Sequence, residues 1–385
     1  MSRGAAFHAM ETLRNSPGFP GQFGKISEVC MTEFPQTFPV PEHQRVDTVA
    51  LQGYVERTVP GFRGALRVER FASGQSNPTY KVMLADGRSL VMRAKPGPQA
   101  KLLPSAHAID REFRVQKAVR AAGLPVPEMF ALCEDESVIG RAFYLMEHVP
   151  GRVFTDPALP GKSPSERAAL YDELNRVLAA LHRIDPATIG LADYGKPGNF
   201  FARQISRWTK QYRASETERI ESMERLMEWL PTAIPAGEEV AIVHGDYRMG
   251  NVMFHPTEPR IVAVLDWELS TLWHPMADVA YHCMQWHSPA GPMYGIAGLP
   301  LKEMGIPEEE SYLRRYCERA GRADPGPWEF YLAYNFFRSA GIIQGIIKRA
   351  QDGIASSPDA YRDASRTRAI ADLGWSIAQK YMSKR

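Results

Sequence analysis

The most restrictive feature of this 385-residue sequence is a polar motif between two short β-rich segments. His244, Asp246 and Asn251 follow the pattern H-x-D-x4-N, and the apolar run 261–265 then ends at a second aspartate, Asp266. Phosphoryl transfer uses such groups, because one carboxylate orients the attacking hydroxyl while an amide and a second carboxylate hold Mg²⁺. The pattern predicts Asp246 as catalytic base and Asn251 and Asp266 as metal ligands. A simpler alternative is that Asp246 and Asn251 only stabilise a tight turn.

The chain before this motif predicts an antiparallel sheet that carries one helix. Asp86-Gly87 lies between two β-rich runs, which is a strong hairpin signal. A charged amphipathic pattern over 107–122 predicts the helix. The expected strands are 65–72, 79–84, 89–94, 129–133 and 142–149.

Helical patterns dominate after Pro150-Gly151. Two segments have the form of a capping box, Ser163 with Glu166 and Ser215 with Glu218. We therefore expect an α+β protein with three parts. These are a flexible N-terminal extension over 1–45, a small nucleotide-binding lobe over 46–149 and a larger, mainly helical, catalytic and substrate-binding lobe over 150–385.

Charge and composition exclude several classes of function. The 46 basic and 44 acidic residues leave a net charge of +2, so no global field attracts nucleic acid or an anionic membrane. The four cysteines form no CxxC pair, which argues against zinc ribbons and disulfide frameworks. No apolar run approaches the length of a membrane span. We expect a soluble, cytoplasmic protein with a small-molecule substrate and no nucleic-acid or membrane partner.

The motifs resemble those of the aminoglycoside phosphotransferase and choline kinase group, small-molecule relatives of the protein kinases. The likeness rests on the segments 244–246 (HGD), 251–254 (NVMF), 265–268 (LDWE) and 275–278 (PMAD). It runs from about residue 50 to near the C-terminus and implies a bilobal protein-kinase-like fold, with ATP and Mg²⁺ as cofactors. Gly245 replaces the arginine of protein kinases, and Asp266-Trp267-Glu268 replaces D-F-G, so a protein substrate is not expected.

The resemblance assigns nucleotide-binding roles upstream. On the third strand a cation reaches the ATP phosphates, and we favour Arg93 over Lys95. Glu112 is its expected partner, with Asp110 as the alternative. A loop between two strands could cover the phosphates with backbone N–H groups and hydroxyls, although a plain hairpin uses similar residues; its members are Ser73, Gly74, Gln75, Ser76 and Asn77.

The hinge and the supporting residues follow from the same resemblance. In kinase-like folds the adenine base bonds to hinge backbone, so Glu147 and Val149 are expected to contribute main-chain groups. His244 and Asp278 are expected to orient and support the catalytic loop.

The segments expected to form the pocket for the acceptor substrate are partly apolar. Residues 279–300 contain no Asp or Glu, which argues against a polycationic aminoglycoside. A helical pattern over 328–350 offers Tyr334, Arg338 and Gln344 as candidate substrate residues.

A more specific resemblance concerns the kinase-like N-terminal region of acyl-CoA dehydrogenase family members 10 and 11. It rests on the segments 74–80, 103–108, 110–115 and 244–248. It implies ATP-dependent phosphorylation of a 4-hydroxyacyl-CoA. Arg203, Arg207 and Lys210 share a helix face that could meet CoA phosphates, although a solvated basic face would look the same. The alternatives are a kinase for another small alcohol, such as an amino alcohol, sugar or aminoglycoside, and a non-catalytic ATP-binding pseudokinase.

Overall fold

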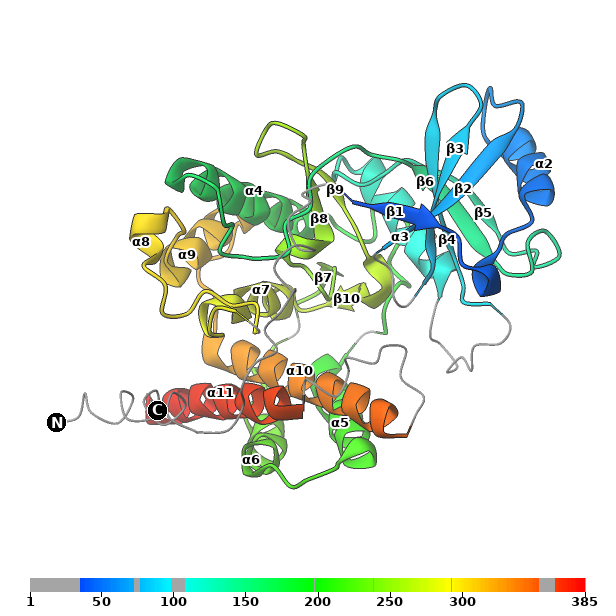
Figure 1. Cartoon of the computed structure of the whole chain (residues 1–385). Coiled ribbons are helices and arrows are strands. Elements are labelled where there is room, and N and C mark those ends of the chain that lie inside the picture. Colours follow the sequence, from blue (N-terminus) through cyan, green and yellow to red (C-terminus); the bar gives the residue numbers. More distant parts are fainter. Residues whose placement is uncertain are drawn as a thin grey trace, which may run out of the picture. The chain divides into compact units, whose positions relative to one another are not determined.

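A six-stranded antiparallel sheet forms the first part of the computed structural model (Figure 1). The structure describes residues 35–72, 77–97, 108–196, 198–237, 239–291, 293–352 and 364–384. The strands lie in the order β1-β2-β3-β4-β6-β5. β3 and β4 pair from Thr79–Arg93 to Met83–Ser89, which confirms the hairpin predicted at Asp86-Gly87. The bounds are β1 Thr37–Pro39, β2 Leu66–Phe71, β3 Thr79–Leu84, β4 Ser89–Ala94, β5 Met129–Cys133 and β6 Phe143–Glu147.

Part of the range 1–45, expected to be a flexible extension, belongs to this sheet. β1 pairs with β2, with Thr37 opposite Phe71 and Pro39 opposite Glu69, and the Thr37 hydroxyl donates to Glu69 Oε2 at 2.6 Å. Proline is tolerated here because β1 is an edge strand. The expectation therefore does not hold for residues 37–39, and residues 1–34 lie outside the described part of the chain.

Two helices cover the sheet, one on each face. Alternate side chains of the strands build two separate hydrophobic clusters. α2 (Thr48–Thr58) adds Leu51 and Val55 to one cluster, and α3 (Ile109–Ala121) adds Ile109 to the other. The Asp47 carboxylate caps α2 by accepting the first free backbone N–H groups of the helix. The sequence analysis predicts α3 but assigns no helix to 48–58.

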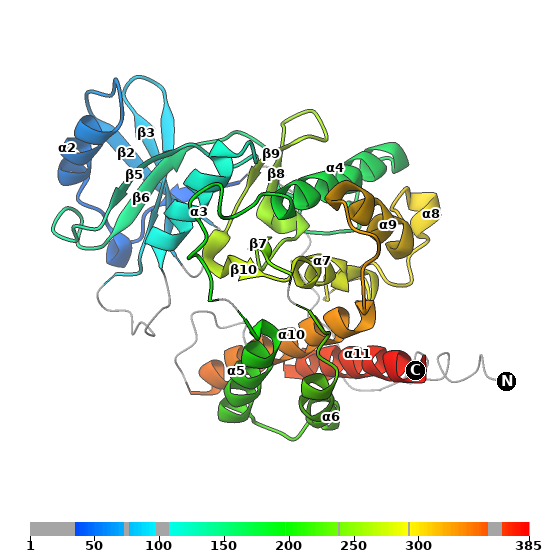
Figure 2. The same ribbon diagram turned by 180° about the vertical axis from the view of Figure 1, so that it is seen from behind.

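Helices dominate after the hinge, as expected. Figure 2 shows α10 beside α5 and α11, and α10 also contacts α7. None of the helices that the structure describes is both long enough and apolar enough to cross a bilayer. The helices are α4 Pro164–His182, α5 Phe200–Ser215, α6 Glu221–Trp229, α7 Pro275–Cys283, α8 Leu301–Met304, α9 Glu309–Ala320, α10 Trp328–Gln351 and α11 Ala364–Ser383.

Four short strands lie among these helices and form two antiparallel pairs, β7–β10 and β8–β9. Their bounds are β7 Ala241–Val243, β8 Val252–Phe254, β9 Ile261–Val264 and β10 Thr271–Trp273. Single 3₁₀ turns are η1 Glu42–Gln44, η2 Leu230–Thr232, η3 Met249–Asn251, η4 Trp267–Leu269 and η5 Met284–Trp286.

Only one of the two predicted capping boxes forms. The Ser163 hydroxyl accepts the N–H of Glu166, and the Glu166 side chain accepts the N–H of Ser163, so α4 begins as predicted. The box predicted at Ser215 and Glu218 is wrong. Ser215 ends α5, and its hydroxyl donates to the backbone oxygens of Gln211 and Tyr212. The next helix, α6, begins only at Glu221 with Ile220 as its N-cap residue, so Ser215 lies too early in the chain to cap it.

The hinge after β6 packs directly on β8. Arg152 and Phe254 exchange two backbone hydrogen bonds of 2.8 Å each. Gly151 lies so close to β8 that a Cβ atom there would be 2.5 Å from the Phe254 backbone oxygen. A glycine at this position therefore lets the sheet meet the helical part without a gap.

Gly151→Ala should lower the free energy of unfolding by about 1–3 kcal/mol, because the added methyl group collides with backbone. Urea denaturation followed by circular dichroism measures this. The matched control is Gly53→Ala inside α2, where the nearest atom is the flexible end of Arg57 at 3.5 Å. That change should raise the free energy by about 0.5–1 kcal/mol. A Gly151→Ala protein with the native free energy of unfolding would contradict the close packing of the hinge.

Candidate active site

The loop between β7 and β8 carries the H-x-D-x4-N motif and lies against the end of β9. Leu265 N donates to Asn251 O at 2.8 Å, which brings the neighbouring Asp266 to the motif. His244 is fully buried; its Nε2 donates to Leu265 O at 2.8 Å and its Nδ1 accepts from Asp246 N at 3.2 Å. Both ring nitrogens are thus occupied within the fold, which suits an orienting residue and not a proton carrier.

A buried carboxylate holds the loop from the other side. Asp278, in the first turn of α7, accepts the backbone N–H groups of His244 at 2.7 Å and Gly245 at 2.9 Å. Its Oδ2 lies 3.3 Å from Nε2 of His182, whose Nδ1 bonds to the Tyr316 hydroxyl at 2.7 Å. Burial acts to raise the pKa of Asp278, but its bonds with His182 and His244 lower that pKa below the usual value. The carboxylate therefore stays charged and fixes the start of the loop.

Gly245 has a left-handed conformation, with φ of +82°, that favours glycine. A Cβ atom there would lie 2.5 Å from the Leu269 backbone oxygen. The arginine that protein kinases carry at this position does not fit here. The Gly245 backbone oxygen accepts a hydrogen bond of 3.0 Å from Arg338 Nη2 of α10.

Asp246 is held in one orientation and keeps an exposed edge, with 20% of its side chain accessible. Asn251 Nδ2 donates to Asp246 Oδ2 at 2.6 Å and to Asp246 O at 2.8 Å. Arg248 Nε lies 3.5 Å from Oδ1. Burial raises the pKa of the Tyr281 phenol, and the neighbouring Asp246 carboxylate raises it further. An oriented, partly exposed carboxylate can accept the proton of a bound hydroxyl.

Arg93 of β4 joins the sheet to the catalytic region. Its Nε lies 2.8 Å from Glu112 Oε2, and its Nη2 lies 2.7 Å from Asp266 Oδ1 and 3.4 Å from Glu268 Oε2. Burial acts to lower the pKa of Arg93, but Tyr144 and these three carboxylates raise it above its usual value. One guanidinium therefore serves three carboxylates from two parts of the chain.

This ion pair shows which acid of α3 pairs with Arg93, whereas the choice between Arg93 and Lys95 at the ATP phosphates stays a prediction. Arg93 is the cation beside Glu112, and Lys95 has no ion pair with any described carboxylate. Glu112, and not Asp110, is the partner on α3; it is 1% exposed. Burial raises the pKa of Glu112, and the Arg93 charge opposes that shift. A carboxylate this deeply buried depends on its cation, because an unpaired buried charge is costly.

The loop predicted to cover the phosphates is only partly described. Ser73, Gly74, Gln75 and Ser76 lie outside the described residues. Asn77 is fully buried, and its Nδ2 donates to Glu112 Oε1 at 2.9 Å. The Tyr144 hydroxyl donates to Glu112 Oε2 at 3.1 Å. The Asn77 side chain therefore positions Glu112.

Hydrogen bonds attach α3 to the larger lobe (residues 150–385) as well as to the sheet. Arg111 Nη2 donates to Tyr194 O at 2.7 Å, and its guanidinium lies 4.2 Å from the Tyr194 ring centroid. The Tyr194 hydroxyl is 2.7 Å from Ser270 Oγ, just beyond η4. Arg114 Nη2 donates to Gly190 O at 2.7 Å. Glu112 thus sits on a helix whose position is set from both sides.

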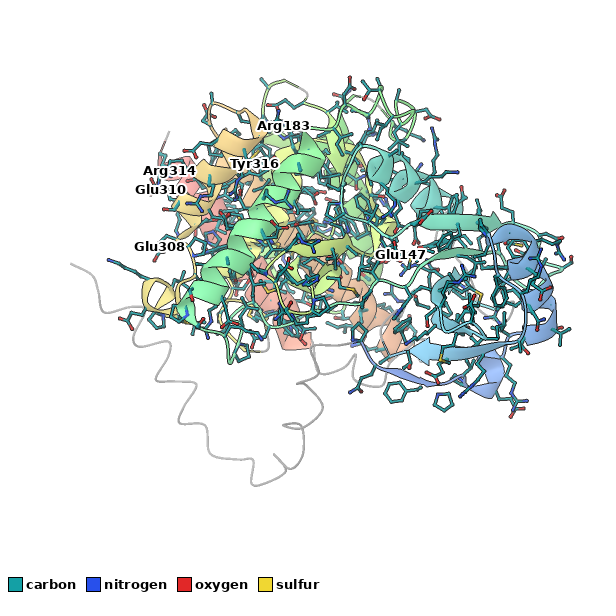
Figure 3. All side chains as sticks on the ribbon, turned by 90° about the horizontal axis from the view of Figure 1, so that it is seen from above. Glu147, Arg183, Glu308, Glu310, Arg314 and Tyr316 are labelled. Carbon is teal, nitrogen blue, oxygen red and sulfur yellow. The ribbon has the colours of Figure 1, made fainter. Side chains whose placement is uncertain are left out.

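A cavity of about 250 Å³ lies at the hinge, where the sheet meets the helical part. Glu147 stands at this junction in Figure 3, and its side chain is engaged elsewhere, because Oε2 accepts from Glu128 N at 3.0 Å. The Glu147 backbone N–H also donates within the fold, to Glu128 O at 2.8 Å. The main-chain contacts of Glu147 and Val149 with adenine therefore stay a prediction. Residues from both parts line the cavity, among them Val91, Met146, Met253, Leu265 and the hinge segment 147–151.

The two predicted metal ligands fit a cation that is shared with phosphate. Among the described residues, no group of three or more His, Cys, Asp or Glu could hold a metal by itself. Mg²⁺ commonly takes one or two protein oxygens and completes its shell with phosphate and water. Asn251 uses its Nδ2 on Asp246, which leaves Oδ1 for a cation, and the Asp266 side chain is 36% exposed.

The candidate substrate residues on α10 have different surroundings. Arg338 contacts the catalytic loop through Gly245 O. Tyr334 is fully buried and packs on the Phe201 and Trp273 rings, with centroid distances of 5.4 Å each. Gln344 donates to Ser215 O at 2.7 Å. Contacts within the fold account for the positions of Tyr334 and Gln344, whereas Arg338 lies nearest to the catalytic loop.

Sequence reasoning misses several residues of the site. Tyr281 lies one helical turn after Asp278, and this spacing could have placed it on the same side of α7. Glu268 follows Asp266 by two residues but carries no separate signal. His182 and Tyr316 come from α4 and α9, and no local pattern links them to a loop so distant in the sequence.

Asp278→Asn should lower the free energy of unfolding at pH 7 by about 3 kcal/mol, because an amide has one acceptor for two buried N–H groups. The pKa of Asp278 in the folded state lies below its usual 3.8. The charged Asp278 side chain therefore contributes its full stabilisation of the fold above pH 3.8. This stabilisation is lost as the pH falls through the folded-state pKa. Denaturation at several pH values should show the difference from native protein shrinking in acid. Asp324→Asn, in an exposed loop, is the control and should change little. A pH-independent difference would contradict a charged Asp278.

Comparisons with known proteins agree with this geometry. The model of the phosphotransferase enzyme family matches residues 67–331. The chain is 44% identical over 375 residues to acyl-CoA dehydrogenase family member 10 of Mus musculus, covering 97% of this chain and 34% of that protein. It is 41% identical over 352 residues to family member 11 of Rattus norvegicus, covering 89% of this chain and 44% of that protein. The chain thus spans less than half the length of these relatives.

A crystal structure from Ralstonia eutropha, provisionally assigned as an aminoglycoside phosphotransferase, is also similar. It is 56% identical and superimposes with a TM-score of 0.81, covering 87% of this chain and 99% of that one. The predicted resemblances and the kinase-like α+β fold are therefore confirmed. The chain belongs to the phosphotransferase enzyme family.

Proposed function

We propose that this enzyme transfers the terminal phosphoryl group of ATP, with Mg²⁺, to the hydroxyl of a 4-hydroxyacyl-CoA. The observation that carries the transfer chemistry is the meeting of Asp246 and Asn251 with Asp266 beside the buried cation Arg93. A tight turn alone accounts for the bond between Asp246 and Asn251, but not for a cation brought to Asp266 from another part of the chain.

The nucleotide takes the hinge cavity and the cleft beside it. A volume of about 250 Å³ lies below the usual range for whole ligands, so the cavity suits the adenine base alone. Backbone groups of Glu147 and Val149 bond to the base. The phosphates extend toward Arg93, and the loop from Ser73 to Asn77 covers them with backbone N–H groups. Arg93 is well suited because its planar guanidinium has several N–H donors. Some of them can bind a phosphate while Nε stays paired with Glu112.

Asn251 Oδ1 and the Asp266 carboxylate would hold Mg²⁺, which would supply positive charge to neutralise the ATP phosphates. The Arg93 contact with Asp266 Oδ1 is compatible with this role, because a carboxylate has a second oxygen and more lone pairs than one guanidinium uses.

Asp246 orients the acceptor hydroxyl and takes its proton. The hydroxyl oxygen forms a bond to the terminal phosphorus as the bond from that phosphorus to the bridging oxygen breaks, and ADP leaves with the electron pair. Asn251 keeps the carboxylate in place through the 2.6 Å bond. His244 and Asp278 position the loop and take no part in proton transfer.

The charges near Asp246 favour an anionic or neutral acceptor. Arg248 lies 3.5 Å from Asp246 Oδ1, and Arg338 binds the preceding residue, Gly245. Aminoglycosides carry several ammonium groups, so these cations oppose their binding. The two mammalian relatives are named as acyl-CoA dehydrogenases, and on this basis we place the hydroxyl on an acyl-CoA.

Purified protein with ATP and Mg²⁺ should release ADP with 4-hydroxyacyl-CoAs and not with free 4-hydroxy acids, choline or aminoglycosides. ³¹P NMR of the product identifies the phosphorylated hydroxyl. Asp246→Asn should lower kcat by about 10²–10⁴-fold, since it removes the proton acceptor, and should leave the Kd for ATP unchanged. Asp185→Asn, in an exposed turn, is the matched control. Turnover with choline or a sugar alone would favour a different small-molecule kinase, and ATP binding without any turnover would favour a pseudokinase.

Arg93→Lys should raise the KM for ATP about tenfold, equivalent to about 1.4 kcal/mol, because an ammonium cannot fork between Glu112 and a phosphate. The control is Lys95→Met, which should leave this KM within about twofold of native, because Lys95 takes no part in the ion pair. Thermal melting of both variants checks that they fold. The reverse order of the two effects would assign the phosphate contact to Lys95.

A further inference from the structure

Helix α5 presents a basic face beside α10, which contacts the catalytic loop through Arg338. From Lys196 to Ala214 the sequence has five Lys or Arg and no Asp or Glu. Arg213 is balanced by Glu216, at 3.2 Å, and by Glu224. The exposed residues of the other face line an open hollow of about 830 Å³ and include no acid: Ala202, Arg203, Ser206, Arg207, Lys210 and Gln211.

The arrangement of these cations is unfavourable in the absence of an anion. Arg207 precedes Lys210 by three residues, so these two charges on the helix repel each other. Neither Arg207 nor Lys210 forms an ion pair with a described carboxylate. A bound polyanion would relieve this repulsion.

A short path of side chains connects the hollow to Asp246. The Arg207 guanidinium lies 5.6 Å from the ring centroid of Trp208, and the Arg338 guanidinium lies 6.0 Å from the same ring. Arg338 donates to the backbone oxygen of Gly245, the residue before Asp246. α5 and α10, which carry these residues, lie side by side in Figures 1 and 2.

We propose that this hollow binds the phosphate groups of the CoA part of the acceptor, with Arg207 and Lys210 as the principal contacts. The inference rests on the proposed function and adds a second anion site, separate from the ATP phosphates at Arg93. A CoA thioester carries its phosphates far from the acyl hydroxyl, which matches a cationic surface one helix away from the catalytic base. Arg207 can bind a phosphate with two parallel hydrogen bonds, and Lys210 adds a point charge.

The site is tested by direct binding of CoA, which does not require turnover. Calorimetry is carried out on the full chain with a saturating non-hydrolysable ATP analogue, so that the adenine of CoA cannot enter the hinge cavity. Arg207→Glu with Lys210→Glu should weaken CoA binding by at least about tenfold, equivalent to 1.4 kcal/mol. The milder pair Arg207→Gln with Lys210→Gln should weaken it in the same direction.

The matched control reverses two exposed cations elsewhere, Lys302→Glu with Arg314→Glu, and should leave the Kd for CoA unchanged. Pantetheine, which lacks the phosphates, should bind native and α5-variant proteins equally. In turnover with a 4-hydroxyacyl-CoA, the α5 variants should raise the KM for the thioester and leave kcat unchanged.

Native protein that does not bind CoA, or α5 variants that bind it as tightly as the control, would overturn the inference. Equal weakening with pantetheine would do so too, because the effect would then be independent of phosphate. If CoA binding follows the prediction but no hydroxyacyl-CoA is phosphorylated, the proposed acceptor fails while the CoA site stands.

Discussion

The position of the catalytic base depends on one buried carboxylate. Asp278 accepts two consecutive backbone N–H groups at the end of β7, and these are the groups that a tight left-handed turn leaves without strand partners. The turn directs the chain toward Asp246, and Asn251 then fixes the Asp246 carboxylate. Loss of a buried charged acceptor is costly because the donors stay desolvated. The geometry of the loop is therefore built into the core and does not rely on a ligand.

Three carboxylates meet at Arg93 in the cleft. Glu112, Asp266 and Glu268 all lie within ion-pair distance of this guanidinium. Asp266 and Glu268 are 36% and 28% exposed at the side chain, so water moderates their repulsion. Glu112 has no such relief and depends on Arg93 and on bonds from Asn77 and Tyr144. This division fits the proposal that a metal binds on the exposed side, at Asp266, while the buried side at Glu112 stays fixed.

The sequence predicts those parts of the fold that have a local physical cause. Asp86-Gly87 produces its hairpin, and Ser163 with Glu166 begins α4, because the groups involved are close in the chain. Ser215 with Glu218 carries the same local pattern and fails. The packing of Met223, Leu226 and Met227 places α6 further along, from Glu221. Local signals are sufficient only where tertiary packing agrees with them.

The candidate site shows the same limit. Asp246, Asn251 and Asp266 are found from spacing alone, because one hairpin brings them together. The Asn77 side chain bonds to Glu112, a contact across 35 residues that no local pattern encodes, whereas the cover of the phosphates by this loop stays a prediction. The position of Tyr281 beside Asp246 is not predicted from the sequence, because the two residues lie on different elements.

The double attachment of α3 has a mechanical consequence. The helix is bonded to the sheet through Glu112 and to the large part through Arg111 and Arg114. The hinge at Gly151 forms a second attachment, through the backbone pairing of Arg152 with Phe254. The two parts are thereby joined at separate places, and wide swinging of one against the other would have to break the Arg93–Asp266 ion pair and the bonds from α3 to Tyr194 and Gly190. In the proposed enzyme, the nucleotide would therefore enter and leave while these attachments stay in place.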